Sequence, residues 1–154
     1  TGLKKNIVRA IPLPPIALCK GPVPIYPSNK KVKNFFNKLG STVEINNEKL
    51  SLNFWTTSAM MAPFYELLLS LSNWLVKKGI KKNSAQKYIS SLFLALSEDA
   101  FNHKTNLKKL VKNSQTPGGL NEQAVKDLRK AGFYNLLEKT SNKIMKRLNK
   151  SQSN

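Results

Sequence analysis

The segment with the clearest chemical potential is a short loop, Thr116-Pro117-Gly118-Gly119, which lies just before a predicted helix. Two adjacent glycines allow the backbone to turn its N–H groups into a concave nest, and the dipole of the following helix favours an anion there. A carboxylate or a phosphate would fit such a nest. The same glycines also suit a plain interhelical turn, because glycine tolerates positive φ angles. The loop residues by themselves favour the plain turn.

Other reactive side chains are few. His103 follows Asp99 by one helical turn, which allows a general base but is more typical of a helix-end histidine beside a carboxylate. Cys19 has no histidine pair to activate it, so we expect a structural role. One cysteine and one histidine exclude a disulfide framework, a zinc cluster and a triad with a spare histidine. We therefore predict no metal site, and the catalytic residues stay unknown.

The net charge of +18, from 26 basic and eight acidic residues, raises the question of an anionic partner. Nearly all the basic residues are lysine, with arginine only at positions 9, 129 and 147. Direct base readout uses arginine, and single-strand binding uses exposed aromatic residues between basic ones. Neither pattern is visible. The charge therefore favours a solvated surface, and a basic nucleic-acid-binding domain remains an alternative.

The opening Leu3-Lys4-Lys5, followed by the apolar residues 11–19, superficially resembles a secretory or lipoprotein leader. Residues 11–22 carry four prolines, which argue against the helix of a secretory leader. The longest apolar stretch, residues 64–76, is interrupted by polar residues and is too short to cross a bilayer. We expect no membrane association and a cytoplasmic location.

The first part of the chain has the pattern of an α/β layer. Residues 6–11, ended by Pro12, and residues 22–27 are extended segments, and proline prevents either from being an ordinary central strand throughout its length. An amphipathic helix over 31–39 and a strand over 41–45 follow. The order strand, strand, helix, strand is typical of the end of such a layer rather than of a complete sheet.

From residue 47 onward the periodicity is helical. Helices are predicted over residues 50–61, 64–78, 83–103, 105–112, 121–131 and 133–149. The helix over 64–78 is apolar on most faces, which places it in a bundle centre or a subunit interface. Thr105 and Asn121 are the expected N-caps of their helices. The predicted fold class is mainly α, and 154 residues suffice for about one to one and a half domains.

Three short segments, in order, resemble motifs of pyrroline-5-carboxylate reductase, the last enzyme of proline synthesis. Residues 8–15 (VRAIPLPP), with Gly21 after them, are similar to the family's R-x-M-P-N-x-P segment. Residues 59–65 (AMMAPFY) lie where the family has S-G-S-G-P-A-Y, and residues 115–121 (QTPGGLN) where it has T-S-P-G-G-T-T. Gly132-Phe133 and Lys146-Arg147 match a G-F break and an arginine near the C-terminus.

The resemblance implies a fold, a cofactor and a site. Residues 1–46 would be the end of a Rossmann-type domain that binds NADPH or NADH, and residues 47–154 an all-helical domain that forms a homodimer. The substrate, a small imino acid, would bind through its carboxylate at a loop that corresponds here to Thr116, Pro117, Gly118, Gly119 and Asn121. Pro12 would border the cofactor. The parent protein would then be an NAD(P)-dependent oxidoreductase.

The sequence also departs from the family pattern. Met60 and Met61 replace small residues, and Leu13 replaces an asparagine. Leu120 and Asn121 replace two threonines that contact substrate in the family. The glycine fingerprint of the Rossmann domain is absent, so this chain alone is expected to lack the cofactor site. These departures allow a paralogue with another substrate, or a non-catalytic helical dimer that serves as an interaction module.

Overall fold

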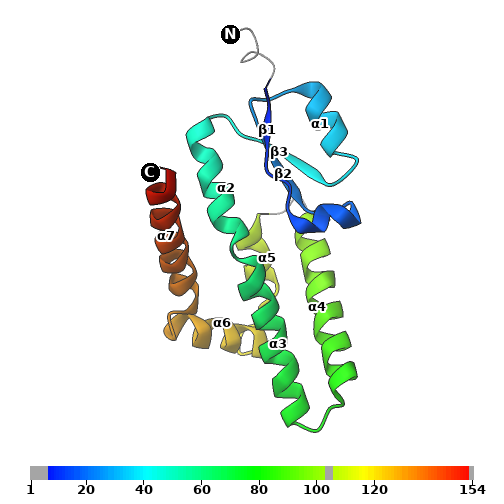
Figure 1. Cartoon of the computed structure of the whole chain (residues 1–154). Helices are drawn as coiled ribbons and strands as arrows, with labels where there is room; N and C mark the ends of the chain where they lie inside the picture. Colours follow the sequence, from blue (N-terminus) through cyan, green and yellow to red (C-terminus); the bar gives the residue numbers. More distant parts are fainter. Residues whose placement is uncertain (1–6, 103–105, 153–154) are drawn as a thin grey trace. The chain divides into compact units, whose positions relative to one another are not determined.

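The computed structural model describes residues 7–102 and 106–152 (Figure 1). The chain divides into two compact units, one formed by Thr1–Ala59 with Ser141–Asn154, and the other by Met60–Thr140. His103 and Thr105 lie outside the described residues. The predicted fold class is confirmed, because most elements are helices and they follow a small sheet. The predicted domain division after residue 46 concerns the family's domains and stays a prediction.

The first unit contains a three-stranded sheet in the order β1-β2-β3. Strand β1 (Arg9–Ala10) pairs antiparallel with β2 (Pro22–Tyr26), and β2 pairs parallel with β3 (Ser41–Glu44). Helix α1 (Lys30–Phe36) connects the two parallel strands, as such a pairing requires. Val23 and Ile25 of β2 are fully buried and form the centre of this unit.

β2 is the middle strand of the three, but it pairs with β1 over two residues only, so it is not an ordinary central strand throughout its length. The reason lies in the direction of its backbone groups. The carbonyls of Gly21 and Ile25 accept hydrogen bonds from Ser41 and Ile45 on the β3 side, each at 2.9 Å. Pro24 instead directs its carbonyl to the other side, where the N–H of Ile11 donates at 3.1 Å. The missing N–H of Pro24 therefore falls on the side of the two-residue strand β1, where the ladder is shortest.

Two one-turn 3-10 helices and a longer helix complete the connections of the first unit. The 3-10 helices η2 and η3 cover Pro14–Leu18 and Glu48–Leu50, and α2 covers Ser51–Ser58. Buried Thr56 of α2 donates its hydroxyl proton toward the Leu52 carbonyl at 2.9 Å and lies 3.5 Å from the sulfur of Met145. This contact joins α2 to the C-terminal part of helix α7 (Phe133–Gln152).

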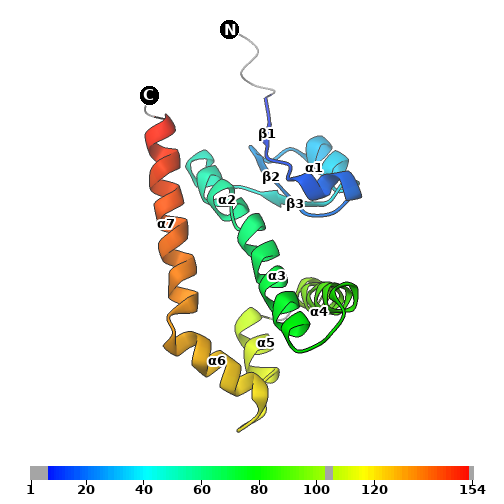
Figure 2. The ribbon, with the colours of Figure 1, turned by 60° about the horizontal axis from the view of Figure 1, so that its bottom comes forward.

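The second unit begins with a helical hairpin, whose two helices run antiparallel in Figure 1 and remain neighbours in Figure 2. Its helices are α3 (Met61–Lys77) and α4 (Lys82–Asn102). Gly79 ends α3 with φ at 92°, as its position after the apolar run predicted. The structure starts α3 three residues earlier than predicted, because Pro63 fits the first turn of a helix, where no N–H is needed.

Helices α5 (Leu107–Asn113) and α6 (Leu120–Lys130) follow. Asn106 is the N-cap of α5, and its side chain accepts the N–H of Lys108 at 2.8 Å. The N-cap of α6 is Gly119 rather than the predicted Asn121. Gly119 has the extended backbone of a capping residue, with φ −82° and ψ 168°, whereas Asn121 already lies inside the first turn.

Much of the apolar surface in the second unit stays uncovered within a single chain. Tyr65 and Trp74 of α3 are 62% and 57% exposed, and Leu94 and Leu96 of α4 are also exposed. Only Ala85 and Ile89 of this unit are buried apolar residues among those described. The apolar helix is therefore not enclosed by its own chain. In the described part of the chain, no helix combines the length and apolarity needed to span a membrane.

Candidate functional site

The loop between α5 and α6 is closed tightly by its own hydrogen bonds. The N–H of Gly119 donates to the carbonyl of Thr116 at 2.8 Å. The side-chain amide of Asn121 donates to the carbonyl of Ser114 at 2.9 Å. The predicted residues of this loop thus lie together, and Asn121 ties the start of the loop to α6.

The two glycines are needed for different physical reasons. Gly118 has φ at 73°, in the left-handed region that favours glycine. Gly119 has an ordinary φ, but a Cβ on it would lie 2.9 Å from the carbonyl oxygen of Thr116. Gly118 therefore sets the turn, whereas Gly119 allows the backbone to close on itself.

The first turn of α6 presents backbone donors that the described residues do not satisfy. Gly119 provides no side chain to cap the helix. Gln123 is the first residue whose N–H bonds back, to Gly119 at 3.1 Å, and within the described residues no acceptor faces the N–H groups of Leu120, Asn121 and Glu122. These donors and the helix dipole together suit a carboxylate or phosphate oxygen.

The carboxylate of Glu122 already accepts one N–H group of the expected nest. Its carboxylate accepts the N–H of Gly118 at 2.9 Å and pairs with Lys126 at 3.0 Å. The Gly118 N–H, followed by Lys126, lowers the pKa of Glu122 below its usual 4.5. The donors left for a ligand therefore belong to α6 and not to Gly118.

Sequence reasoning overlooked Glu122, although a signal for it exists. A glutamate three residues after an N-cap is typical of a capping box, in which the carboxylate folds back toward the residues before the helix. That spacing applies when Gly119 is the N-cap. The expectation of Asn121 as the cap concealed the pattern.

Pro12 lies in the first unit, beside a hollow of about 880 Å³. Residues of β1, η3, α2 and α7 line this hollow, and Arg9 pairs with Glu48 across 3.2 Å at its wall. Ser51 also lines it, and its buried hydroxyl has no hydrogen-bond partner among the described residues. Pro12 is exposed, so its ring can form one edge of a ligand site.

The remaining candidates do not form a reactive cluster in the described part of the chain. Cys19 is exposed and has a left-handed backbone at the end of η2. His103 lies outside the described residues. No group of three metal-ligating side chains occurs within residues 7–102 and 106–152.

Comparison with solved structures identifies the fold. A pyrroline-5-carboxylate reductase from Coxiella burnetii is similar with a TM-score of 0.84 and 21% identity, covering 97% of this chain and 58% of that protein. The NADP-bound pyrroline carboxylate reductase of Plasmodium falciparum has a TM-score of 0.78 and 20% identity, and the match covers 95% of this chain and 60% of that protein. The pyrroline-5-carboxylate reductase of Streptococcus pyogenes has a TM-score of 0.76 and 18% identity, and the match covers 91% of this chain and 57% of that protein. The chain thus spans less than two thirds of each of these enzymes.

Sequence comparison locates the family within the chain. No curated protein matches the sequence. The pyrroline-5-carboxylate reductase dimerisation family matches residues 49–151, which include α2 through nearly all of α7. The sheet and α1 precede this match, as in the structures above. The matched region covers most of the sequence, and the chain belongs to the pyrroline-5-carboxylate reductase dimerisation family.

Proposed function

We propose that the chain is the C-terminal part of an NAD(P)-dependent reductase that reduces the C=N bond of a small cyclic imino acid, as in proline biosynthesis. Membership of the dimerisation family and the likeness of the fold support this proposal. The observation that carries it is the first turn of α6, where three backbone N–H groups have no acceptor among the described residues. An imino-acid carboxylate is the group that such a turn would hold.

The proposed role of the loop is to bind and orient the substrate. The N–H groups of Leu120, Asn121 and Glu122 would donate to the carboxylate and fix the ring relative to the cofactor. Backbone donors do this without the two threonines of the family pattern, because the position of an N–H depends on the fold rather than on the side chain. Fixed orientation is a large part of catalysis when the cofactor performs the bond change.

The proposed cofactor is NADP or NAD, which when bound supplies the hydride. The exposed ring of Pro12 fits one edge of a nicotinamide site. The chain offers no glycine-rich phosphate cradle of the dinucleotide-binding kind. The rest of the cofactor site would therefore come from the Rossmann-type domain that the family resemblance implies.

The proposed assembly is a homodimer formed through the helical unit. The exposed apolar side chains of α3 and α4, including Tyr65 and Trp74, need a cover that their own chain does not give them. A second copy of the same helices would enclose this surface, as the family's description as a dimerisation domain suggests.

The test uses the complete gene product and follows oxidation of NADPH and of NADH. Pyrroline-5-carboxylate is compared with the same cyclic imine lacking the carboxylate. We expect turnover of the acid, and a kcat/KM at least about 100-fold lower for the imine, since losing even two of the three charge-assisted hydrogen bonds removes about 3 kcal/mol. Equal rates for the two compounds would contradict the carboxylate cradle.

A non-catalytic helical dimer is the second candidate. Leu120 is 84% exposed, and Asn121 uses its side-chain amide to hold Ser114, so neither replaces the function of a substrate-binding threonine. A complete gene product that dimerises but oxidises neither cofactor with any cyclic imine would favour this candidate.

A further inference from the structure

A second hollow in the helical unit has the character of an anion site. It has a volume of about 490 Å³ and is lined by residues of α5, the following loop and α6. Its size falls within the range of sites for small molecules. Lys108 and Lys112 contribute from α5, and Arg129 contributes from α6. Basic residues of two helices therefore line one hollow; the two helices meet at their connecting loop in Figure 2.

The basic residues that line the hollow outnumber its acidic residues. Within the described residues, no carboxylate pairs with Lys108, Lys112 or Arg129. Glu122 is the acid in the wall, and its carboxylate is already engaged by Gly118 and Lys126. The hollow therefore carries positive charge that its own wall leaves uncompensated.

The arrangement is unfavourable without a ligand. Lys108 and Lys112 are one turn apart on the same face of α5, and like charges at this spacing destabilise a helix. Val111 and Pro117 form an exposed apolar part of the wall. An anion bound between the helices would remove the repulsion.

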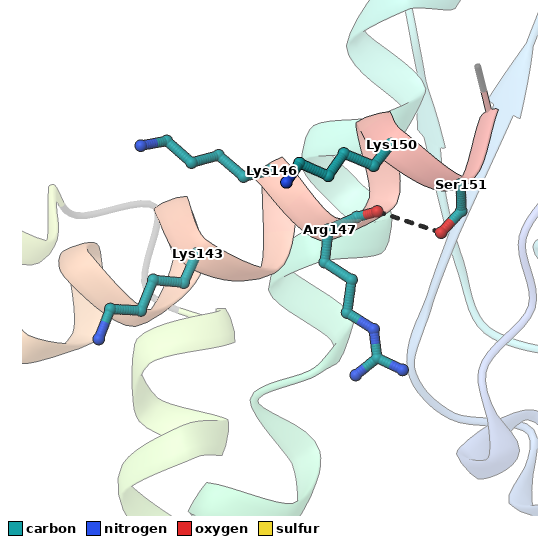
Figure 3. A pocket seen from close by; sticks show the side chains of 5 residues that line it. All are labelled: Lys143, Lys146, Arg147, Lys150 and Ser151. Atoms are coloured by element: carbon teal, nitrogen blue, oxygen red, sulfur yellow. Dashed lines mark hydrogen bonds between the residues drawn. The ribbon is translucent and has the colours of Figure 1, made fainter. Parts of the chain in front are cut away.

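The basic strip on α7 provides a contrast. Lys143, Lys146, Arg147 and Lys150 line a shallow hollow formed by a single helix. Figure 3 shows their side chains leaving the helix in different directions, so they do not converge on one point. Charge alone, in a protein of net charge +18, therefore does not define a site. The hollow between α5 and α6 differs in that its basic residues come from two helices.

We propose that the hollow between α5 and α6 binds a small anion with two or more phosphate groups, such as pyrophosphate or the diphosphate of a metabolite. Several negative charges match three cations better than one carboxylate does, and a guanidinium can bind a phosphate through two hydrogen bonds. The limited volume favours a small molecule over a polymer. The proposal does not depend on the reductase function.

The test measures pyrophosphate binding by isothermal titration calorimetry at physiological ionic strength, where long-range attraction is screened. We expect saturable binding of one pyrophosphate per chain. Lys112→Gln and Arg129→Gln should each weaken binding about tenfold, the effect of losing one hydrogen bond to a charged group. Circular dichroism establishes that each variant remains helical.

The matched controls are Lys143→Gln and Arg147→Gln, which remove the same charge from α7. Their affinity for pyrophosphate should stay close to that of the unmodified protein. Equal weakening in all four variants would show general attraction to a basic protein and overturn the proposal. If pyrophosphate shows no saturable binding, the proposal is also overturned. The same holds if a single-stranded oligonucleotide binds more tightly than pyrophosphate and its affinity does not change in Lys112→Gln.

Discussion

The replacement Gly119→Ala tests whether the closed loop builds the proposed carboxylate cradle. The added Cβ would lie 2.9 Å from the Thr116 carbonyl oxygen and 3.3 Å from the Thr116 Cβ. Both distances are shorter than ordinary contacts, and the nearer atom belongs to the backbone. The loop must therefore open, which lengthens the 2.8 Å hydrogen bond from Gly119 to Thr116 and shifts the first turn of α6.

The size of the effect follows from these contacts. Overpacking of this kind costs about 1–3 kcal/mol of folding stability. Displacement of one backbone donor from a bound carboxylate removes about 1.5–3 kcal/mol, which corresponds to roughly 10- to 100-fold weaker binding. We therefore expect a rise of this size in the KM for the imino acid. The KM for the cofactor should not change, because the loop contributes no phosphate cradle for it.

The assay is steady-state kinetics of the complete gene product, with Gly118→Ala as the matched control. A Cβ on Gly118 meets nothing within 4 Å, and its only cost is the left-handed φ of 73°, about 1–2 kcal/mol of stability. Both variants should lose thermal stability, but only Gly119→Ala should lose affinity for the substrate. The reasoning is refuted if Gly119→Ala retains its KM, or if both variants lose affinity equally.

Three further predictions concern charge, assembly and cofactor. The Gly118 N–H and Lys126 lower the pKa of Glu122, so its ionised carboxylate stabilises the fold above about pH 4.5. This stabilisation is lost as the pH falls through the lowered pKa. Glu122→Gln should thus reduce Tm at neutral pH, with the difference vanishing in acid; a constant difference would contradict this. Trp74→Glu should weaken a homodimer by about 2–3.5 kcal/mol per protomer, because Trp74 is 57% exposed in the single chain and the partner would cover it. Sedimentation equilibrium measures this, and an unchanged dimer constant would place the interface elsewhere. The 154-residue chain alone should bind no dinucleotide, so tight NADPH binding in a fluorescence titration would overturn the assignment of the cofactor site.

Local signals predicted most of the elements. Gly79 and Gly132 end or separate helices where predicted, and both have the positive φ that their positions suggested. The strand, helix and strand at 22–45 were also predicted with nearly the correct bounds. These features depend on residues a few positions apart, so their physical causes are present in the sequence itself.

The sequence by itself also determined that Gly118 and Gly119 form a turn before a helix, and that this turn resembles a family motif. Only the tertiary structure decided that Gly119 is needed for close approach to Thr116 and that Glu122 occupies the Gly118 donor. It also decided that β2 is the middle strand of its sheet, and that Arg129 shares a hollow with lysines of another helix. The physical reason is that turn and helix preferences act between near neighbours, whereas hydrogen-bond partners, strand order and the lining of a hollow depend on how the folded chain returns to itself.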